Sequence, residues 1–567
     1  MEPIIDPRGK QERPTLKLAP RVSEDVLRRG PILFFDNTKL SFCNYMEVFR
    51  RIKENLAKEG ITNFIDFRET VRGKSTQELK DYAAMLARSG PVASVVALGD
   101  MGTSPATSIL TIGLEEQGIP TVYITAPPGH DLARAVAFYR AGRLCLCPVD
   151  IYQGSTIEDI QKEVDRQMPR LIESLTKPMD RIGKLSSLHF TLDQVAPADD
   201  GFLELAGKIR FDETALSEPA AYIEEVTDIF NSLHLGDGLP IVPPTQRRYR
   251  RMLAYCPFDP DMILAHEIGP SGGNITVRDV VVAAVMAGCR PMYMPVLITA
   301  FRAMANPKYN FLQSVTTSHP GGNLILVSGP LAQELGIHGG QGCLGPGFPA
   351  NATIGRAINL TIINVCRSVP GHTDLACISS QAEFTYCFAE DPELSPWPTI
   401  NTERFGSKTT TVLVLKAEPP HDIIDFLSPT ACDLLDTIID SCTTLGSNNS
   451  YIPGNLIIVL TPDHARLLDR DGWNKEEIRE HIHARAHHDM KIVTNRGLVS
   501  VRPEGFETMD PVPVTRSPRD VEIVVAGGRG GHSAVILPWA LHSEAVVEPI
   551  LTHDGEVATT IEDFRRA

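Results

Sequence analysis

Polar residues that could bind a ligand follow an apolar run near the middle of the first 200 residues. The run Val95–Asp100 (VVALGD) leads directly into MGTSPATS. Ser104 is suited to cap a helix that begins here, and Pro105 fits its first turn, where a missing N–H costs nothing. Such a helix would present free backbone N–H groups and its positive dipole end at the tip of a buried strand. Thr103 and Ser104 are therefore predicted to bind an anion or an electrophilic oxygen, and Asp100 is a candidate to orient a ligand hydroxyl or amine.

Two further groups follow apolar runs of the same kind. Asp36 and Asn37 end PILFFDN, and His130 comes shortly after TVYITAP. In a parallel sheet the carboxyl ends of the strands share one edge, where ligands bind. We therefore expect Asp36, Asn37 and His130 to lie near Asp100, with His130 as a candidate acid or base. Ser104 itself is favoured as a cap over a nucleophile, because GDMGTSPA is not the GxSxG of a hydrolase elbow.

A glycine-rich block, residues 336–357, is the strongest functional signal in the second half. Its glycines suit tight turns or a close backbone approach to a ligand. Asn351 and Arg356 open the helix that follows, and Arg356 could grip a carboxylate or phosphate with both arms of its guanidinium. Nucleotide binding is the minority interpretation, since no GK[ST] follows the glycines and no GxGxxG follows a strand.

Several histidines lie beside turn glycines or prolines rather than on apolar stripes. His319, His464 and His532 are the candidate acids or bases among them. Two or three could converge with Glu390 or Asp391 on a divalent metal, although no HxxxH or HExxH pair supports this. The cofactor is therefore left unassigned. The cluster HIHARAHH is interpreted as a solvated helix face, and Cys343, inside the glycine-rich block, is a candidate nucleophile.

The elements that must position these residues alternate regularly between residues 31 and 178. Five apolar strands are separated by helical segments, which predicts an α/β fold with a flavodoxin-like, doubly wound parallel sheet. Residues 1–30 are expected to form an extended arm and residues 179–220 a linker. Residues 221–567 are predicted to form a larger α/β or α+β domain that carries the glycine-rich block.

Composition limits the partners. The chain has 567 residues and a net charge of −16, which argues against nucleic acid. No apolar run is long enough to span a membrane, and the first residues lack a secretory pattern. The eleven cysteines are scattered, as expected of free thiols in a reducing compartment, so the expected localisation is cytoplasmic. The expected partner is a small-molecule substrate, and assembly into a homo-oligomer stays open.

Several segments together resemble the UGSC family, whose N-terminal domain is named for a selenocysteine-Gly-Ser-Cys motif. The resemblance spans most of the chain. It rests on APR with LFFDN, LGDMGTS, GIPTVYI, LGDGLPIVPPT, MAGCRPMYMPV, TTSHPGG, LGPGFPANATIGRA, FAEDPELSPW and PDHARLL with the Gly-Trp that follows.

The departure from the family motif bears on the chemistry. Met101 stands where the family pattern has selenocysteine or cysteine, and Ser104 stands where it has the second cysteine. A thioether cannot form a thiolate, and a hydroxyl cannot resolve a disulfide. The thiol-redox or selenol function that the resemblance implies is therefore excluded at this position. A binding pocket lined by Asp100, Thr103 and Ser104 remains.

The combined expectation is an enzyme with two α/β domains. Its site is predicted where the strand ends of the first sheet face the glycine-rich region near His319 and Asn351. The expected reaction is a non-redox cleavage or elimination, by a lyase or hydrolase, on a small polar or anionic metabolite, in keeping with specialised metabolism. Two alternatives stay open. One is a non-catalytic binding or scaffold protein, and the other is an oxidoreductase that uses Cys343 or a bound cofactor.

Overall fold

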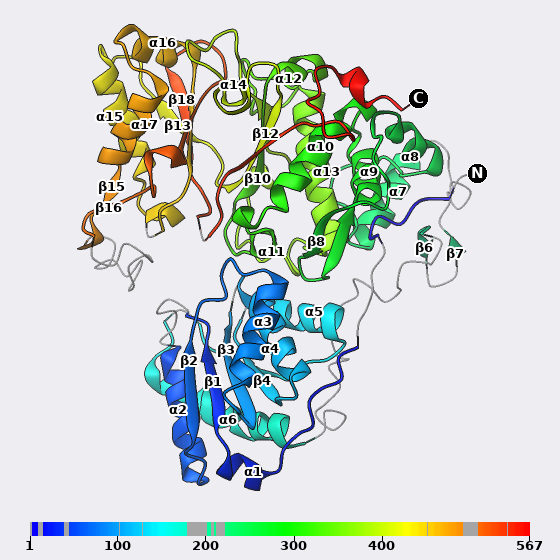
Figure 1. Ribbon diagram of the computed structural model, residues 1–567, viewed down its shortest axis with the longest axis vertical. Coiled ribbons are helices and arrows are strands. Elements are labelled where there is room, and N and C mark those ends of the chain that lie inside the picture. The colour runs from blue at the N-terminus through cyan, green and yellow to red at the C-terminus, as the bar shows by residue number, and fades with distance from the viewer. Residues whose placement is uncertain are drawn as a thin grey trace.

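The computed structural model has two bodies, one formed by residues 15–177 and the other by the later residues together with residues 3–9 (Figure 1). It describes residues 3–9, 15–38, 45–100, 102–127, 129–152, 154–177, 201–205, 209–210, 222–450, 452–491, 509–540 and 542–566. Met101 and most of the expected linker, residues 179–220, lie outside the described residues. In the described part of the chain, no helix combines the length and apolarity needed to cross a bilayer.

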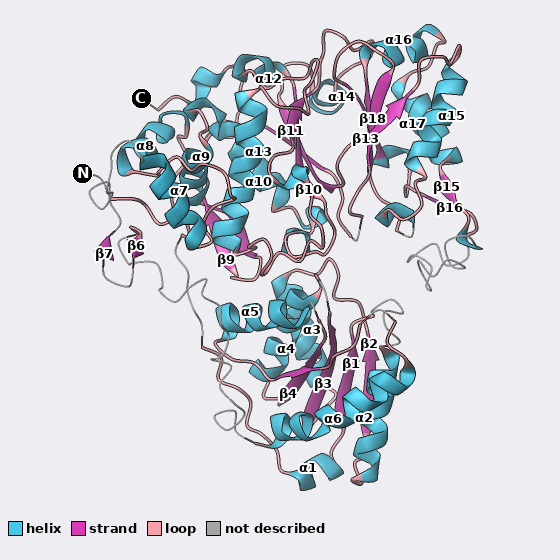
Figure 2. Ribbon diagram, turned by 180° about the vertical axis from the view of Figure 1, so that it is seen from behind, coloured by secondary structure: helices cyan, strands magenta, loops and turns pink. Residues whose placement is uncertain are grey.

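The first domain confirms the predicted flavodoxin-like sheet. Five parallel strands lie in the order β2-β1-β3-β4-β5, with helices on both faces (Figure 2). Strands β1 and β3 are completely buried, as their unbroken apolar sequences require. The strands are β1 Ile32–Asp36, β2 Phe64–Arg68, β3 Ala93–Gly99, β4 Thr121–Thr125 and β5 Leu146–Pro148. The helices are α1 Glu24–Arg29, α2 Met46–Lys58, α3 Thr76–Ala87, α4 Ser104–Glu116, α5 Gly129–Ala141 and α6 Ile157–Thr176.

The N-terminal segment differs from the expected extended arm. Ile4 and Ile5 are buried in the core of the second domain, where they form bridges with Thr245 and Phe202. Further along, Ser23 caps α1. The segment thus packs against both domains. Ile4 and Ile5 are buried in the core of the second domain, and Leu16 packs against a core cluster of the first.

The second domain is α+β, with two four-stranded mixed sheets. Their orders are β11-β10-β12-β19 and β13-β18-β14-β17. The strands are β8 Ile263–Ile268, β9 Gly273–Thr276, β10 Gly322–Ser328, β11 Cys387–Ala389, β12 Thr411–Ala417, β13 His421–Ile424, β14 Leu456–Leu460, β15 His487–His488, β16 Val512–Pro513, β17 Val521–Val525, β18 His532–Ile536 and β19 Val546–Pro549, with the short pair β6 Glu204–Leu205 and β7 Ile209–Arg210 before them. The helices are α7 Tyr222–Ser232, α8 Gln246–Met252, α9 Val277–Ala287, α10 Met294–Met304, α11 Phe311–Ser314, α12 Pro330–Leu335, α13 Pro349–Thr361, α14 Ile400–Phe405, α15 Ala431–Cys442, α16 Pro462–Arg470 and α17 Lys475–Arg485.

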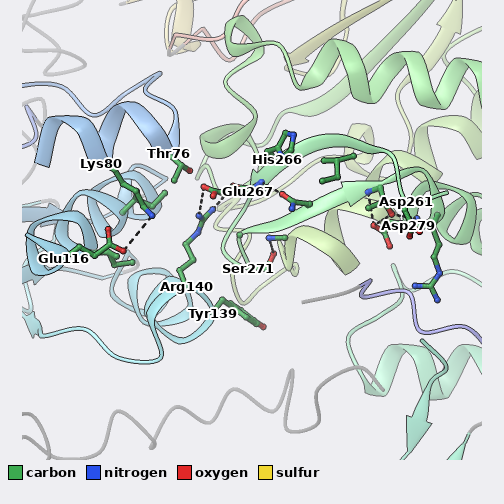
Figure 3. Close-up of a pocket in the computed structure, with 18 residues that line it drawn as sticks. Thr76, Lys80, Glu116, Tyr139, Arg140, Asp261, His266, Glu267, Ser271 and Asp279 are labelled. Atoms are coloured by element: carbon green, nitrogen blue, oxygen red, sulfur yellow. Dashed lines mark hydrogen bonds and ion pairs between the residues drawn. The ribbon is translucent and has the colours of Figure 1, made fainter. Parts of the chain in front are cut away.

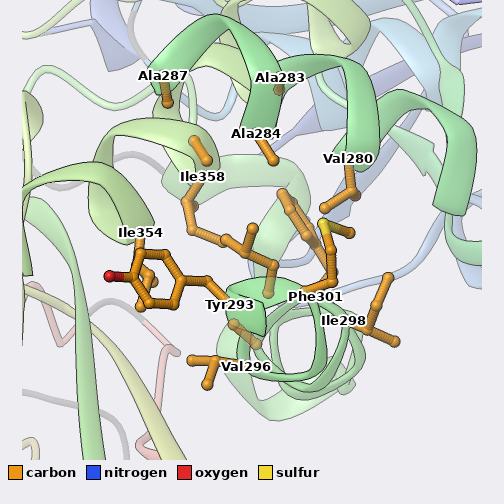
Figure 4. Packing of buried hydrophobic residues seen from close by; sticks show 14 of the residues in the cluster. Val280, Ala283, Ala284, Ala287, Tyr293, Val296, Ile298, Phe301, Ile354 and Ile358 are labelled. Atoms are coloured by element: carbon orange, nitrogen blue, oxygen red, sulfur yellow. The ribbon is translucent and has the colours of Figure 1, made fainter. Parts of the chain in front are cut away.

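Three buried helices, α9, α10 and α13, form the centre of the second domain (Figure 4). Alanines on α9 let the helices approach closely, and Tyr293, Phe301 and Ile358 fill the space between them. Thr276 caps α9, and Gly288 ends it in the left-handed region with φ +82°. The apolar stretch is thus interrupted between Gly288 and Pro291.

The two domains are joined by the short helix α11. Leu312 belongs to the hydrophobic cluster on the α3–α4 face of the first domain, although it comes from the second. Gln313 Nε2 donates to the Val71 carbonyl at 3.0 Å. From this seam β10 runs away from the first domain toward α12 at the far side (Figure 1). The residues just before β10 therefore lie near the seam, and those that directly follow it lie on the far side of the second domain.

Candidate functional site

The carboxyl edge of the first sheet ends in a buried polar loop at the start of α4. Thr103 occupies the N-cap position, and Ser104 is the first helical residue, so the predicted cap is displaced by one position. Neither side chain caps the helix: in the described structure α4 begins without a side-chain hydrogen bond to its first amides. Pro105 lies in the first turn, as predicted. Among the described residues, the positive end of this 13-residue helix therefore has no side-chain cap.

Three hydroxyl groups at this helix end are buried. Among the described residues, Thr103 Oγ1, Ser104 Oγ and Ser108 Oγ have no hydrogen-bond partner. Ser104 and Ser108 are fully buried, and Asp100 is fully buried beside them. A buried hydroxyl without a partner costs about 1–3 kcal/mol. Three such groups between Thr103 and Ser108 make the start of α4 a candidate site for a polar ligand.

The second domain closes this loop from the opposite side. Thr316 Oγ1 donates to the Gly102 carbonyl at 3.3 Å. A side chain at Gly102 would lie 2.9 Å from the Thr317 Cα, so only glycine allows this approach. Thr316 and Thr317, in the segment Thr316–Pro320, thus contact the residue that precedes Thr103, and the motifs LGDMGTS and TTSHPGG meet at the seam.

His319 lies in the same segment and is held at both ring nitrogens. Its Nε2 is 3.2 Å from Glu418 Oε1, and the Gly321 N–H donates to Nδ1 at 3.1 Å. These partners assign the neutral ring as the Nε2–H tautomer. Glu418 orients the ring through this contact, and a carboxylate in that position is common beside a histidine acid or base.

Sequence reasoning missed a charged group behind this loop. Lys416 is buried on β12 beside its register partner Asn323. Burial lowers the pKa of the Lys416 ammonium, while Glu383 and Asp374 oppose that shift. Burial also raises the pKa of the Glu383 and Asp374 carboxyls. The signal was available, because a lysine ends the otherwise apolar strand TTTVLVLKA.

Other predicted residues at the strand ends have partners within the chain. Asn37 is buried, donating to the Leu98 carbonyl at 2.9 Å and to Thr107 Oγ1 at 3.0 Å. Asp36 accepts from the Tyr45 hydroxyl at 2.8 Å and lies 3.4 Å from Arg68. These contacts tie the end of β1 to β3 and α4. Sequence reasoning placed both residues at the correct edge of the sheet.

His130 begins α5 at the end of β4. Its Nδ1 is 2.6 Å from Thr125 Oγ1. Burial lowers the pKa of His130, which keeps its ring neutral and able to accept a proton at neutral pH. Gly129, just before it, packs on the backbone of Asp100 with no room for a side chain. His130 therefore lies at the same sheet edge as Asp100, as predicted.

The glycine-rich block does not face the first domain, so the expected cleft between these surfaces is wrong. The block follows β10, whose seven residues span about 20 Å and lead away from the seam. It packs instead on the end of β17: the Gly527 N–H donates to the Gly339 carbonyl at 2.7 Å. Asn351 holds the turn by donating to the carbonyls of His338 and Cys343.

Arg356 and Cys343, two predicted site residues of the glycine-rich block, are poorly suited to the roles predicted for them. Arg356 forms a two-armed ion pair with Asp237, at 2.6 and 2.8 Å, so the carboxylate that it grips belongs to its own chain. Burial raises the pKa of the Cys343 thiol to about 11, which removes most of its thiolate at neutral pH.

The other two predicted histidines, His464 and His532, lie in the part of the second domain that is built around the sheet β13-β18-β14-β17. His464 is buried, with Nδ1 2.7 Å from Ser533 Oγ and Nε2 2.8 Å from the Asp425 carbonyl. His532 is exposed and lies 3.0 Å from Asp422. His464 lies on α16, directly after β14, and His532 begins β18. Within the described ranges, no three His, Cys, Asp or Glu side chains gather as metal ligands.

Comparison with known proteins supports the resemblance for the first domain. Residues 3–177 match the model of the UGSC family. No curated protein and no solved structure matches the chain. The matched residues cover the whole flavodoxin-like sheet and the loop between β3 and α4.

Proposed function

We propose that this chain, whose residues 3–177 form a UGSC-family domain, is an enzyme that acts on a small anionic metabolite at the seam between its domains. The anionic group would bind at the start of α4, and the reaction would be a non-redox cleavage or elimination. The observation that carries the proposal is the set of buried, unpartnered hydroxyls of Thr103, Ser104 and Ser108 at an uncapped helix end in the described structure.

The chemistry of that helix end favours an anion over a neutral ligand. Backbone N–H groups and hydroxyls both donate hydrogen bonds, and the dipole adds a partial positive charge. Hydrogen bonds to a charged acceptor are about twice as strong as those to a neutral one. A carboxylate or phosphate would therefore offset the cost of leaving these donors buried.

The opposite side of the seam supplies a proton-transfer group. His319 belongs to the loop that contacts Gly102, and Glu418 orients its ring. A cleavage or elimination needs a base to take a proton and an acid to return one. His319 would exchange that proton through Nδ1, which now accepts from the Gly321 N–H.

Calorimetric titration with inorganic phosphate and with malonate tests the binding step. We expect Ser104→Ala and Thr103→Val to weaken binding by about tenfold, the loss of one charge-assisted hydrogen bond. Ser94→Ala is the matched control, since Ser94 Oγ is also buried without a partner in the described structure but lies at the other end of β3. Equal affinity in the parent and its three variants would contradict the proposal, and so would a complete absence of phosphate and malonate binding.

Metabolite profiling tests turnover. Purified protein is incubated with a small-molecule extract, and mass spectrometry follows which compounds disappear and form. An enzyme consumes many equivalents of one compound, and we expect His319→Ala to abolish this while His421→Ala, an exposed histidine on β13, retains it. Depletion limited to one equivalent, unchanged by His319→Ala, would instead identify a binding protein.

A further inference from the structure

A second cavity lies between the two domains, away from the start of α4 (Figure 3). Its volume is about 750 Å³, within the range of small-molecule sites. One wall comes from α3, α4 and α5 of the first domain. The other comes from the hairpin β8–β9 and the start of α9 in the second domain. Neither domain could form this cavity alone.

Charges of both signs line the cavity in pairs. Lys80 Nζ lies 3.8 Å from Glu116 Oε1 on the helical wall. Arg140 reaches across the seam, with NH1 3.9 Å from Glu267 Oε2 on the hairpin. Both distances are too long for a good hydrogen bond, so each pair leaves donors and acceptors for a ligand. A ligand with only one charge would face repulsion from one member of each pair.

Arg140 is the most buried of these charged groups. Its side chain is 9 % exposed and donates to the Glu267 and Gly269 carbonyls at 2.7 and 3.0 Å. Its Nε has no partner among the described residues. Burial lowers the pKa of Arg140 to about 10, so the guanidinium stays charged at neutral pH. Arg140 thus places a largely buried positive charge in the wall of the cavity, which favours a carboxylate on the ligand.

The hairpin presents its carboxylate in an unusual backbone conformation. Glu267 has a φ of +52°, in the left-handed region that costs a residue with a side chain about 1 kcal/mol or more. The Asn274 side chain accepts from the Glu267 N–H at 3.0 Å and holds this conformation. Ile109 and Ile112 from α4 and Ile263 from β8 add apolar surface between the charged pairs.

We propose that this cavity binds a small zwitterion with an apolar side chain, such as a free α-amino acid. Its carboxylate would lie toward Arg140 and Lys80, its ammonium group toward Glu267 and Glu116, and its side chain on the isoleucines. Because the ligand contacts both walls, it stabilises the joined arrangement of the domains. The wall of the cavity that belongs to the first domain includes α4, and the N-terminal end of that helix forms the proposed anion site.

Three ligands of one shape test the charge requirement: L-leucine, 4-methylpentanoate, which lacks the ammonium group, and 3-methylbutylamine, which lacks the carboxylate. Calorimetry and thermal melting at up to about 10 mM ligand measure their binding to the full chain. We expect leucine, or L-methionine and L-phenylalanine tested beside it, to bind and to raise the melting temperature. The singly charged analogues should bind at least about tenfold more weakly.

Variants locate the site. Lys80→Met and Glu267→Gln should each weaken amino-acid binding by about tenfold. Lys162→Met is the matched control, because Lys162 forms a similar exposed pair on α6, outside the cavity. Ser104→Ala should bind leucine normally, so failure of the anion site and failure of this site are distinguishable. No amino-acid binding, equal binding of the singly charged analogues, or unchanged binding in Lys80→Met and Glu267→Gln would overturn the proposal.

Discussion

Arg356 illustrates how a residue suited to ligand binding can serve the fold. Its guanidinium grips Asp237 with both arms and also donates to the Pro240 carbonyl at 3.0 Å. Both side chains of the pair are largely buried. The pair joins LGDGLPIVPPT to LGPGFPANATIGRA, two segments that are far apart in the sequence. The ion pair thus explains why both segments carry a charge beside glycines.

Removing one partner of this pair should destabilise the protein. We expect Arg356→Met to lower the free energy of unfolding by about 3 kcal/mol, because Asp237 would be left buried without a counter-charge. Urea unfolding measures this. Arg356→Lys should recover only part of the loss, since lysine cannot form two parallel hydrogen bonds. A stable Arg356→Met protein that has lost only anion binding would show that Arg356 serves the ligand instead.

Cys343 should be an unreactive thiol. With its pKa raised to about 11 by burial, only about 0.1 % of it is thiolate at pH 8. Iodoacetamide at pH 8 should therefore modify the exposed Cys377 and Cys432 well before Cys343. Peptide mass spectrometry follows the three sites. Labelling of Cys343 as fast as of Cys377 would restore it as a candidate nucleophile.

At the scale of elements, the loop between β3 and α4 depends on a close contact across the seam. Gly102 has room for no side chain, because a Cβ there would approach the Thr316 carbonyl to 3.1 Å and Thr317 Cα to 2.9 Å. Backbone atoms cannot move aside as a flexible side chain can. The position therefore links the geometry of the anion site to the position of the second domain.

Gly102→Val should disturb the site without unfolding the first domain. We expect a loss of anion affinity of about tenfold or more, because the Thr316–Pro320 segment must move away. Circular dichroism checks that the helices and strands remain. Ser94→Ala, at the other end of β3, is the control and should keep the parent anion affinity. Unchanged phosphate and malonate affinity in Gly102→Val would contradict the role of this contact.

The short strand β15 gives the protein a sensitivity to acid. Burial lowers the pKa of His488 to about 4, whereas a histidine in an unfolded chain titrates near 6.5. The folded form therefore binds fewer protons between these values, and stability falls as the pH decreases from about 6.5 to about 4. The shift corresponds to a total loss of about 3 kcal/mol.

Replacing His488 should remove that loss. The free energy of unfolding of His488→Leu, measured in urea at several pH values, should change less between pH 6.5 and 4 than that of the parent. His421→Leu changes an exposed histidine and should keep the parent slope. Parallel pH profiles for His488→Leu and the parent would show that other groups cause the acid loss.

At the scale of the whole molecule, the two domains share a core residue. Leu312 is 8 % exposed and extends from α11 into the cluster on the α3–α4 face. Truncating a buried leucine costs about 2–5 kcal/mol, and here the loss falls on the joining of the domains. Leu312→Ala should therefore weaken their association.

Small-angle scattering and calorimetry measure that effect. We expect Leu312→Ala to have a larger radius of gyration than the parent. Its two thermal transitions should also lie further apart in temperature than those of the parent. Ile424→Ala, an equivalent truncation at a residue 60 % exposed on β13, should change neither. A compact Leu312→Ala protein with a single unchanged transition would show that other contacts hold the seam.

The sequence determined the local features of this protein. Unbroken apolar runs specified the buried parallel strands, capping boxes at Ser75 and Thr156 began their helices, and Asp100, Thr103 and Ser104 were correctly placed at a strand end. These depend on residues close together in the chain. The resemblance added the family of the first domain, which the match over residues 3–177 supports.

The tertiary structure alone decided which of these local features face one another. The glycine-rich block lies beyond β10, while Thr316, before β10, contacts the loop at the start of α4. Pairings such as Arg356 with Asp237, and the placing of Lys416 near Glu383 and Asp374, join residues that are remote in sequence. They follow from how strands and helices fill two cores, and no periodicity or spacing along one chain encodes that arrangement.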